Sequence, residues 1–396
     1  MKIGIIRETF PGERRVAMAP KAMDVLAKSG VEFLVEASAG LQAGFRDEEY
    51  RGKGARIEPE RAAVIEAADV ILQVRTLGAN PVEGRADLSL LRQGQVLIGF
   101  CEALTAPRAC ADLAARGLTT FAMELMPRIT RAQSMDALSS MATVAGYRAV
   151  LLAAEALPRL FPMLMTAAGT IAPARVFVLG AGVAGLQAIA TARRLGAVVS
   201  GYDLRPAVRE QVESLGAKFV QLSVDGAGAE DQGGYAKAMG EDFYRRQRDL
   251  IAAVAREQDV IITTAAVPGQ KAPVLITAEM VRSMAPGSVV VDLAAERGGN
   301  CELTRAGETV VDCGVTVLGP LNLASAAPYH ASQMYARNIA TFLKHLIQNG
   351  NLAVNFDDEI TLETLVTYGG EVLHPRVRQA MGLGPAAVAE LVGKGV

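Results

Sequence analysis

The chain has 396 residues, of which 51% are hydrophobic and 21% charged, a globular balance that is sufficient for two domains of ordinary size. Its net charge of −2, without a basic tract, argues against a nucleic-acid partner. We expect a cytoplasmic protein, because the N-terminus reads as a strand rather than a signal peptide and the most apolar region, 149–168, is interrupted by charges and prolines.

The first segment of the chain alternates strand and helix patterns, which is typical of a mostly parallel sheet covered on both faces. We expect strands at 2–7, 31–36, 69–75, 96–100 and 118–125, and helices at 20–28 and near 60–67 and 107–115.

A long helical pattern then follows Met126, with Thr130 or Ser134 as its cap, and a second one covers 328–348. Each lies next to a βαβ region and reads as a connector, and the 46 residues from Asn351 to the end are too few for a third domain. We therefore predict an α/β fold of two doubly wound Rossmann-like domains linked by two long helices. The first domain, 1–135 with 330–396, is discontinuous, and the second covers 136–329.

The second domain contains the most informative motif. A β-branched, apolar run ends in Gly-x-Gly-x-x-Gly at Gly180, Gly182 and Gly185, and a helical pattern follows over 185–195. The first glycine permits the turn, the second lets a pyrophosphate approach the backbone, and the third allows close packing of helix and strand. The free N–H groups of the helix N-terminus, including that of Val183, favour a phosphate.

A second strand, at 197–202, ends in Asp203, where a carboxylate can accept hydrogen bonds from the adenine ribose and repel a 2′-phosphate. The site should therefore prefer NAD(H), with Leu204 and Arg205 beside the ribose. Arg205 is a complication because arginine can favour a 2′-phosphate. The alternative is a phosphate-free turn whose glycines serve packing alone.

Further strands are expected at 218–222, 260–265 and 288–293, with a hairpin over 310–318. The glycine-rich segment 223–242, which includes Gly234 and Tyr235, is either a flexible insertion or a lid over the nucleotide. The four cysteines lack metal-binding or disulfide spacing and read as buried thiols, and the three histidines are scattered, so no metal is expected.

Taken together, these motifs resemble the NAD(H)-binding soluble domain of proton-translocating nicotinamide nucleotide transhydrogenase, in its separate α-subunit form. The segment Arg-Ile-Thr-Arg-Ala-Gln-Ser-Met-Asp at 128–136 is the most specific match. The others are 7–8, 13–17, 145–149, 180–188, 233–237, 292–294 and 298–300.

Alanine dehydrogenases are similar at Arg15 and near Asp292, and they are the main alternative. They need a lysine on the strand at 69–75 and a histidine just after the strand at 96–100. This chain has Gln73 and Arg75, and then Cys101. Oxidative deamination requires a proton-transfer group, whereas hydride transfer between two nicotinamides requires only alignment of the rings.

The resemblance implies that Arg128, Gln133, Asp136 and Ser139 hold the nicotinamide end of NAD(H), and we include Ile129, Thr130 and Arg131 in that site. The amide of Gln133 can complement the carboxamide of nicotinamide. From the residues alone, helix capping by Thr130 and Gln133 is the favoured reading, and it is the resemblance that favours the nicotinamide site instead. The sequence departs from the family pattern at Met141 and Thr143, and at 320–321 before Asn322.

The resemblance further implies a homodimer that transfers hydride from NADH to NADP⁺, with the NADP(H) site on a separate β subunit and with Re/Si stereospecificity. A membrane-spanning subunit would couple the reaction to proton translocation and hold this chain at the inner face of the cell membrane.

Overall fold

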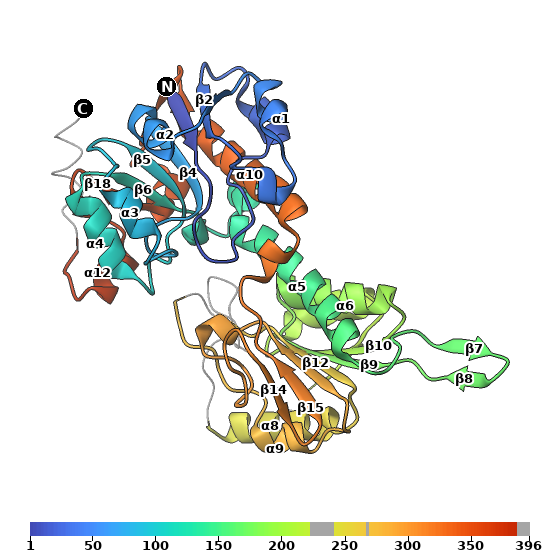
Figure 1. Ribbon diagram of the computed structural model, residues 1–396. Coiled ribbons are helices and arrows are strands. Elements are labelled where there is room, and N and C mark those ends of the chain that lie inside the picture. The colour runs from blue at the N-terminus through green and yellow to red at the C-terminus, as the bar shows by residue number, and fades with distance from the viewer. Residues whose placement is uncertain (222–240, 267–268, 386–396) are drawn as a thin grey trace. The chain divides into compact units, whose positions relative to one another are not determined.

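The computed structural model describes residues 1–221, 241–266 and 269–385. The chain folds into two compact units: unit 1, Met1–Met141 with Ser325–Val396, and unit 2, Ala142–Ala324 (Figure 1). The second unit is thus inserted in the first.

Unit 1 is built on an eight-stranded sheet. Its strands are β1 (Lys2–Ile5), β2 (Glu32–Glu36), β3 (Arg56–Glu58), β4 (Val70–Arg75), β5 (Val96–Phe100), β6 (Thr119–Ala122), β18 (Leu365–Tyr368) and β19 (Glu371–Val372). Their order is β19-β18-β6-β5-β4-β1-β2-β3, in which β1 to β6 run parallel in Rossmann order, β18 pairs antiparallel with β6, and β19 pairs antiparallel with β18. The C-terminal segment therefore returns to the sheet that the N-terminus begins.

Helices cover this sheet: α1 (Asp47–Arg51), α2 (Arg61–Ala67), α3 (Gly84–Leu88), α4 (Pro107–Ala115), α10 (Pro328–Leu346), α11 (Glu359–Thr364) and α12 (Pro375–Ala380). In α10, Tyr335 and Phe342 are fully buried, and Phe342 meets Phe121 of β6 edge to face. The apolar stripe of α10 therefore anchors the second connecting helix in unit 1.

Unit 2 carries a seven-stranded sheet. Its strands are β9 (Arg175–Leu179), β10 (Val198–Tyr202), β11 (Lys218–Phe219), β12 (Val260–Thr263), β13 (Val289–Asp292), β14 (Thr309–Asp312) and β15 (Val315–Leu318). Their order is β11-β10-β9-β12-β13-β15-β14, and β14 alone among them runs antiparallel. The predicted hairpin is present as β14 and β15. Cys313 and Gly314 form its turn, with positive φ values of 49° and 77° that are typical of tight hairpin turns.

Both faces of this sheet are covered. Its helices are α5 (Ala137–Ala156), which enters from unit 1, α6 (Val183–Arg194), α7 (Arg209–Ser214), α8 (Glu241–Ala255) and α9 (Ala278–Arg282). One core packs α5, α6 and α7 against the sheet, and the other packs α8 and α9 (Figure 1). This arrangement confirms the predicted fold class of two doubly wound α/β units. Of the two long helices that were expected to link them, α5 crosses from unit 1 into unit 2, whereas α10 lies within unit 1.

Several boundaries differ from the sequence-based expectations. The segment expected to be a helix at 20–28 is a 3₁₀ helix, Pro20–Leu26, and the strand expected at 118–125 ends at Ala122 and passes into a 3₁₀ turn, Met123–Leu125. Cys313 is exposed in its hairpin turn, so the expectation of four buried thiols is wrong at that position, whereas the other three cysteines are buried.

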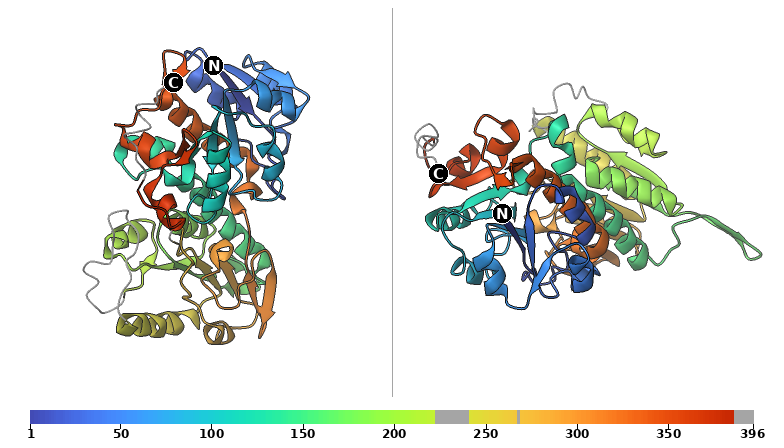
Figure 2. Two further views of the ribbon diagram at one scale, coloured as in Figure 1. Left: turned by 90° about the vertical axis from the view of Figure 1, so that its left-hand side faces the viewer. Right: turned by 90° about the horizontal axis from the view of Figure 1, so that it is seen from above.

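A two-stranded hairpin, β7 (Leu164–Thr166) with β8 (Gly169–Ile171), was not anticipated. It extends away from the sheet of unit 2, and Met163, Met165 and Ile171 expose much of their apolar surface (Figure 2). A smaller hairpin, β16 (Ile347–Gln348) with β17 (Asn351–Leu352), follows α10.

Among the described residues, α5 is one helix with the length and hydropathy of a membrane span. The sequence pattern placed the most apolar region later, at 149–168. In the structure Ala149, Val150 and Ala153 of α5 belong to the core of unit 2, so these apolar residues are used in packing against the sheet.

Candidate functional site

The glycine-rich turn connects the carboxyl end of β9 to α6. The strand order of unit 2 reverses at β9, because β10 lies on one side of it and β12 on the other. Gly180 has φ = 95°, a conformation that L side chains rarely adopt, and a Cβ there would lie 2.6 Å from Thr264 Oγ1. A Cβ on Gly185 would overlap the carbonyl oxygen of Gly180. These two glycines are therefore required by the turn and by helix–strand packing.

Gly182 differs from both. It is the N-cap of α6 with φ = −75°, and a Cβ built on it would meet no atom within 4 Å. The backbone at Gly182 thus faces open space in front of the N-terminus of α6, next to Val183, which is 40% exposed. An open approach to a helix N-terminus is what a pyrophosphate needs, because the first-turn N–H groups and the helix dipole favour an anion.

The first turn of α6 also packs closely against α5. Gly146 of α5 lies so close to α6 that a Cβ would overlap the carbonyl oxygen of Ala184. The two helices therefore meet backbone to backbone, and the position of the glycine-rich turn is fixed by α5 as well as by the sheet.

Asp203 follows β10 and is the centre of a compact polar network. Oδ2 accepts the backbone N–H of Ala181 at 2.7 Å, within the glycine-rich turn, and Oδ1 accepts that of Arg205 at 2.9 Å. The Arg205 guanidinium adds Nε to Oδ1 at 2.9 Å and Nη2 to Oδ2 at 3.0 Å. Leu204, the third residue assigned to this site, is partly buried against the α8–α9 core. The sequence analysis noted that Arg205 could favour a 2′-phosphate. In the structure its guanidinium is paired with the carboxylate of Asp203.

The segment assigned to nicotinamide, 128–139, is amphipathic. Thr130–Met135 forms a 3₁₀ helix that buries Ala132 and Met135, and the Ser134 carbonyl accepts a hydrogen bond from Asn338 of α10 at 2.9 Å. The polar side chains on the other face are exposed, namely those of Arg128, Thr130, Arg131 and Gln133, whereas Ile129 is partly buried. Arg131 pairs with Asp358 at 3.1 Å.

The cap of α5 differs from the expected one. Asp136, not Thr130 or Ser134, receives the first-turn N–H of Ser139 at 2.8 Å, and the Ser139 hydroxyl donates to the same carboxylate at 2.5 Å. Asp136 and Ser139, two residues assigned to nicotinamide, are thus tied to each other and to the start of the helix.

A buried carboxylate organises the end of β13. Asp292 accepts hydrogen bonds from the hydroxyls of Thr263 and Thr304 and from the backbone N–H groups of Ala294, Asn300 and Cys301, at 2.7–3.0 Å. The Asn300 side chain in turn bonds the backbone of Ala265 and Pro273. The sequence stretches at 292–294 and 298–300, singled out for their resemblance, therefore form one structural network at the carboxyl edge of the sheet.

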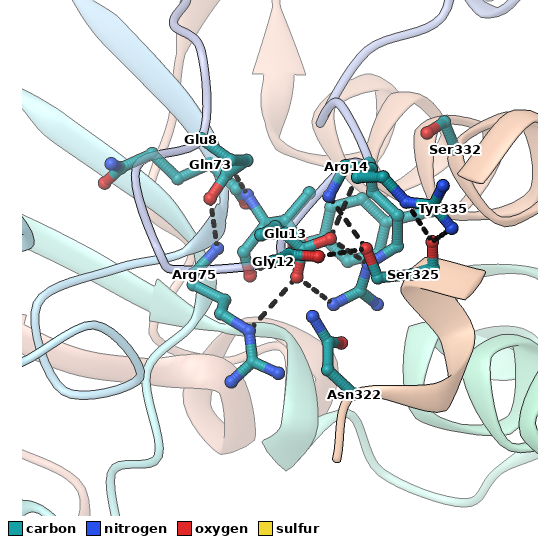
Figure 3. Close-up of polar contacts among 12 residues, drawn as sticks. Glu8, Gly12, Glu13, Arg14, Gln73, Arg75, Asn322, Ser325, Ser332 and Tyr335 are labelled. Atoms are coloured by element: carbon teal, nitrogen blue, oxygen red, sulfur yellow. Dashed lines mark hydrogen bonds and ion pairs between the residues drawn. The ribbon is translucent and has the colours of Figure 1, made fainter. Parts of the chain in front are cut away.

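In unit 1, the corresponding edge holds a charged cluster that the sequence analysis did not identify (Figure 3). Arg15, 4% exposed, is bonded through Nε and Nη2 to the carboxylate of Glu13 at 2.7 and 2.6 Å, and Arg75 Nε reaches the same carboxylate at 3.1 Å. Glu8 accepts the backbone N–H groups of Val74 and Arg75 at 2.6 and 3.1 Å.

The two carboxylates of this cluster have opposite perturbations. Burial and the nearby Glu13 raise the pKa of Glu8 to about 8. Burial alone would also raise the pKa of Glu13, but the guanidinium groups of Arg15 and Arg75 hold it well below its usual range. The sequence signals for this cluster were the charged residues after the first strand and the resemblance at 7–8 and 13–17. Neither showed that Glu13 pairs with Arg75, which lies 62 residues further along the chain.

The positions at which an alanine dehydrogenase needs its acid–base groups lie at this same edge. Gln73 is buried and its backbone carbonyl accepts a hydrogen bond from the hydroxyl of Tyr335 at 2.8 Å, and Arg75 stacks its guanidinium on Phe10 in addition to pairing with Glu13. Cys101 is buried, which raises the pKa of its thiol well above the usual value. At neutral pH none of these three side chains is suited to proton transfer.

Gly234 and Tyr235, two of the predicted cofactor residues, lie outside the described residues. The same holds for the possible lid at 223–242, except for its last two residues. The other predicted residues fall into two groups. Gly180, Gly182, Val183, Gly185, Asp203, Leu204 and Arg205 come together in unit 2, and the residues from Arg128 to Ser139 form one segment of unit 1.

Comparison with known proteins identifies the class. The model of the alanine dehydrogenase/PNT N-terminal domain matches residues 4–145, and that of the C-terminal domain matches residues 149–375. The chain therefore belongs to the alanine dehydrogenase/PNT family.

Within this family the chain is 47% identical to the first portion of the NAD(P) transhydrogenase alpha subunit of Rhodospirillum rubrum over 379 residues, which are 95% of this chain and 98% of the relative. The solved structure of transhydrogenase from Sinorhizobium meliloti is 47% identical, with a TM-score of 0.84 over 94% of this chain and all of that one. The alanine dehydrogenase of Halomonas elongata is 30% identical over 401 residues, 99% of this chain and 100% of its own. The resemblance predicted from the motifs is confirmed.

Proposed function

We propose that this chain is the NAD(H)-binding subunit of a proton-translocating NAD(P) transhydrogenase. It binds NADH and passes a hydride directly to NADP⁺ held by a separate NADP-binding β subunit, with Re/Si stereospecificity. A membrane-spanning subunit couples this exchange to proton translocation. The chain itself acts as a homodimer at the inner, cytoplasmic face of the membrane.

The cofactor is assigned to residues as follows. Its pyrophosphate is held by the turn from Gly180 to Gly185, with the open backbone at Gly182 and the N–H of Val183 facing the phosphates. Its adenine ribose is held at Asp203, beside Leu204 and Arg205. The nicotinamide end is held by the segment from Arg128 to Ser139, in which Arg128, Gln133 and Asp136 align the ring for hydride transfer. Gly234 and Tyr235 complete the proposed site.

One contrast carries the proposal. The carboxyl edge of the unit 2 sheet offers the open, glycine-lined helix N-terminus that a dinucleotide needs. At the carboxyl edge of the unit 1 sheet, the fork of Arg15 is closed on the chain's own Glu13, and Gln73 and Cys101 stand where a deaminating enzyme needs a lysine and a histidine. Direct hydride transfer requires no proton exchange at the reacting carbons, so the proposed reaction does not need the proton-transfer groups that are missing from the unit 1 edge.

The decisive experiment mixes the purified chain with the NADP-binding subunit, NADH deuterated at C4 on the transferred face, and NADP⁺. Mass spectrometry should find the deuterium in NADPH, because the transfer is direct. Deuterium lost to solvent, or no NADPH at all, would contradict the proposal. Gln133→Ala is the informative variant: it should slow deuterium transfer while leaving AMP binding intact, since AMP lacks the nicotinamide.

Alanine dehydrogenase activity is the alternative, supported by the family itself. The same preparation is therefore incubated with L-alanine and NAD⁺, and NADH formation is followed at 340 nm. Sustained alanine-dependent reduction would replace the proposed function with an amino-acid dehydrogenase.

A further inference from the structure

The ribose-binding carboxylate of unit 2 already has its acceptor positions filled by the protein. A carboxylate offers about four lone-pair positions, two on each oxygen. On Asp203, Oδ1 receives the backbone N–H and Nε of Arg205, and Oδ2 receives the backbone N–H of Ala181 and Nη2 of Arg205. These four donors match the capacity of the group, so a further donor must displace one of them.

The four donors differ in how readily they can leave. The N–H groups of Ala181 and Arg205 belong to the main chain, and that of Ala181 is part of the glycine-rich turn itself. Nε and Nη2 lie at the end of a flexible side chain that is 15% exposed. The two guanidinium donors are therefore the exchangeable pair, and they bind one on each oxygen.

A ribose diol also presents two donors, its 2′- and 3′-hydroxyls, to the two oxygens of such a carboxylate. The number of hydrogen bonds to Asp203 is conserved when one pair replaces the other. Because the Asp203 side chain is only 8% exposed, exchange is preferable to a carboxylate left without partners.

We propose that Arg205 is an internal competitor of the adenine ribose: its side-on pair with Asp203 occupies the acceptor positions that the diol uses, and nucleotide binding exchanges guanidinium for diol. Arg205 is thus a positioning residue that acts through Asp203. It holds the carboxylate oriented between binding events and lowers the affinity for every nucleotide with an intact diol. The inference rests on the proposed function, since it concerns the ribose subsite of the same cofactor.

The pair also bears on the choice between NAD(H) and NADP(H). A 2′-phosphate could recruit Arg205 only by taking it from Asp203, which would leave a partly buried carboxylate beside a phosphate of the same sign. The arginine therefore does not favour NADP(H) while Asp203 is present.

The test uses the full chain and the change Arg205→Lys, which keeps the positive charge but cannot bridge both oxygens. Isothermal titration with AMP and with 2′-deoxy-AMP separates the diol from the rest of the nucleotide. Arg205→Lys should tighten AMP by about three- to tenfold, because one two-pronged, charge-assisted competitor is lost. The gain for 2′-deoxy-AMP should be smaller, since one hydroxyl exchanges with one donor only.

Arg209→Lys is the matched control, because Arg209 lies four residues further on and pairs with Glu213 at 2.9 Å in an exposed position. It should change neither affinity. Arg205→Gln is the second variant and should give the same ordering, with a larger gain for AMP than for 2′-deoxy-AMP.

Weaker AMP binding by Arg205→Lys would overturn the proposal, because it would make Arg205 a direct ligand of the nucleotide. An equal change for the two nucleotides, or no change, would overturn it as well. In these cases the wild-type chain still binds NADH and the proposed function stands. A wild-type chain that binds neither AMP nor NADH overturns both.

Discussion

The three glycines of the turn provide the sharpest test of how the nucleotide site is built, since the same substitution has a different consequence at two of them. In Gly185→Ala, the new Cβ overlaps the Gly180 carbonyl oxygen, a backbone atom that cannot rotate away. An alanine in a helix ordinarily gains up to about 1 kcal/mol over glycine, but overpacking of this kind costs about 1–3 kcal/mol or more. We expect a net loss of about 2 kcal/mol in the free energy of unfolding.

In Gly182→Ala, the Cβ meets no protein atom within 4 Å and the backbone φ of −75° suits alanine. The free energy of unfolding should therefore change by less than about 0.5 kcal/mol, as for other substitutions that disturb no packing. The Cβ does, however, fill the space that we propose the pyrophosphate occupies, so NADH affinity should fall at least about tenfold, the equivalent of 1.4 kcal/mol.

Urea denaturation followed by circular dichroism gives the stabilities, and the fluorescence of NADH gives the affinities without interference from tryptophan, which the chain lacks. A Gly182→Ala variant with wild-type NADH affinity would refute the assignment of the pyrophosphate to this turn. A Gly185→Ala variant as stable as the wild type would refute the packing argument.

Three further outcomes are expected. Asp203→Ala should weaken NADH binding by about 1–3 kcal/mol, because an anionic acceptor is lost from the ribose, and unchanged affinity in a titration would remove Asp203 from the site. Glu13→Gln should lower the free energy of unfolding by about 3–5 kcal/mol, because it leaves the guanidinium of Arg15 buried without its anion. The exposed Glu48, which pairs with Arg51, is the control, and a similar small loss for Glu48→Gln and Glu13→Gln would contradict this reading. Since the pKa of Glu8 is raised to about 8 from 4.5, the folded state holds a proton that the unfolded state releases, so the Glu8 contribution to stability is lost as pH rises toward 8. Between pH 6 and pH 8 this amounts to about 2 kcal/mol, and Glu8→Gln should remove that share of the slope; an unchanged slope would show that Glu8 is ionised throughout.

Sequence reasoning succeeded where a local pattern has a local cause. The glycine spacing, the carboxylate at the end of β10 and the turn at Cys313-Gly314 each reflect backbone geometry within a few residues. The apolar periods located most strands of both sheets for the same reason, but they did not reveal β3, β18 and β19 of unit 1. The residues after Asn351 are too few for a third domain, which predicted that the chain returns to unit 1. The pairing of β18 with β6 agrees with this prediction.

It failed where the cause is distant in sequence. Helical periodicity at 128–136 did not reveal that Asp136 begins α5 or that the preceding turn is a 3₁₀ helix anchored by Asn338. The cluster of Glu8, Glu13 and Arg75 depends on a pairing between separate strands, which no window of sequence contains. For Arg205, the sequence placed a cation beside Asp203, but only the structure shows that the two side chains are engaged with each other.

The network around Asp292 has a consequence for the opening of this region of unit 2. Five donors from three stretches of chain, at Thr263, Ala294 and 300–304, converge on one carboxylate, so no single stretch can separate without loosening its neighbours. The amides of Ala294, Asn300 and Cys301 should accordingly exchange their hydrogens in one cooperative event and at a common rate limit, rather than fray one by one.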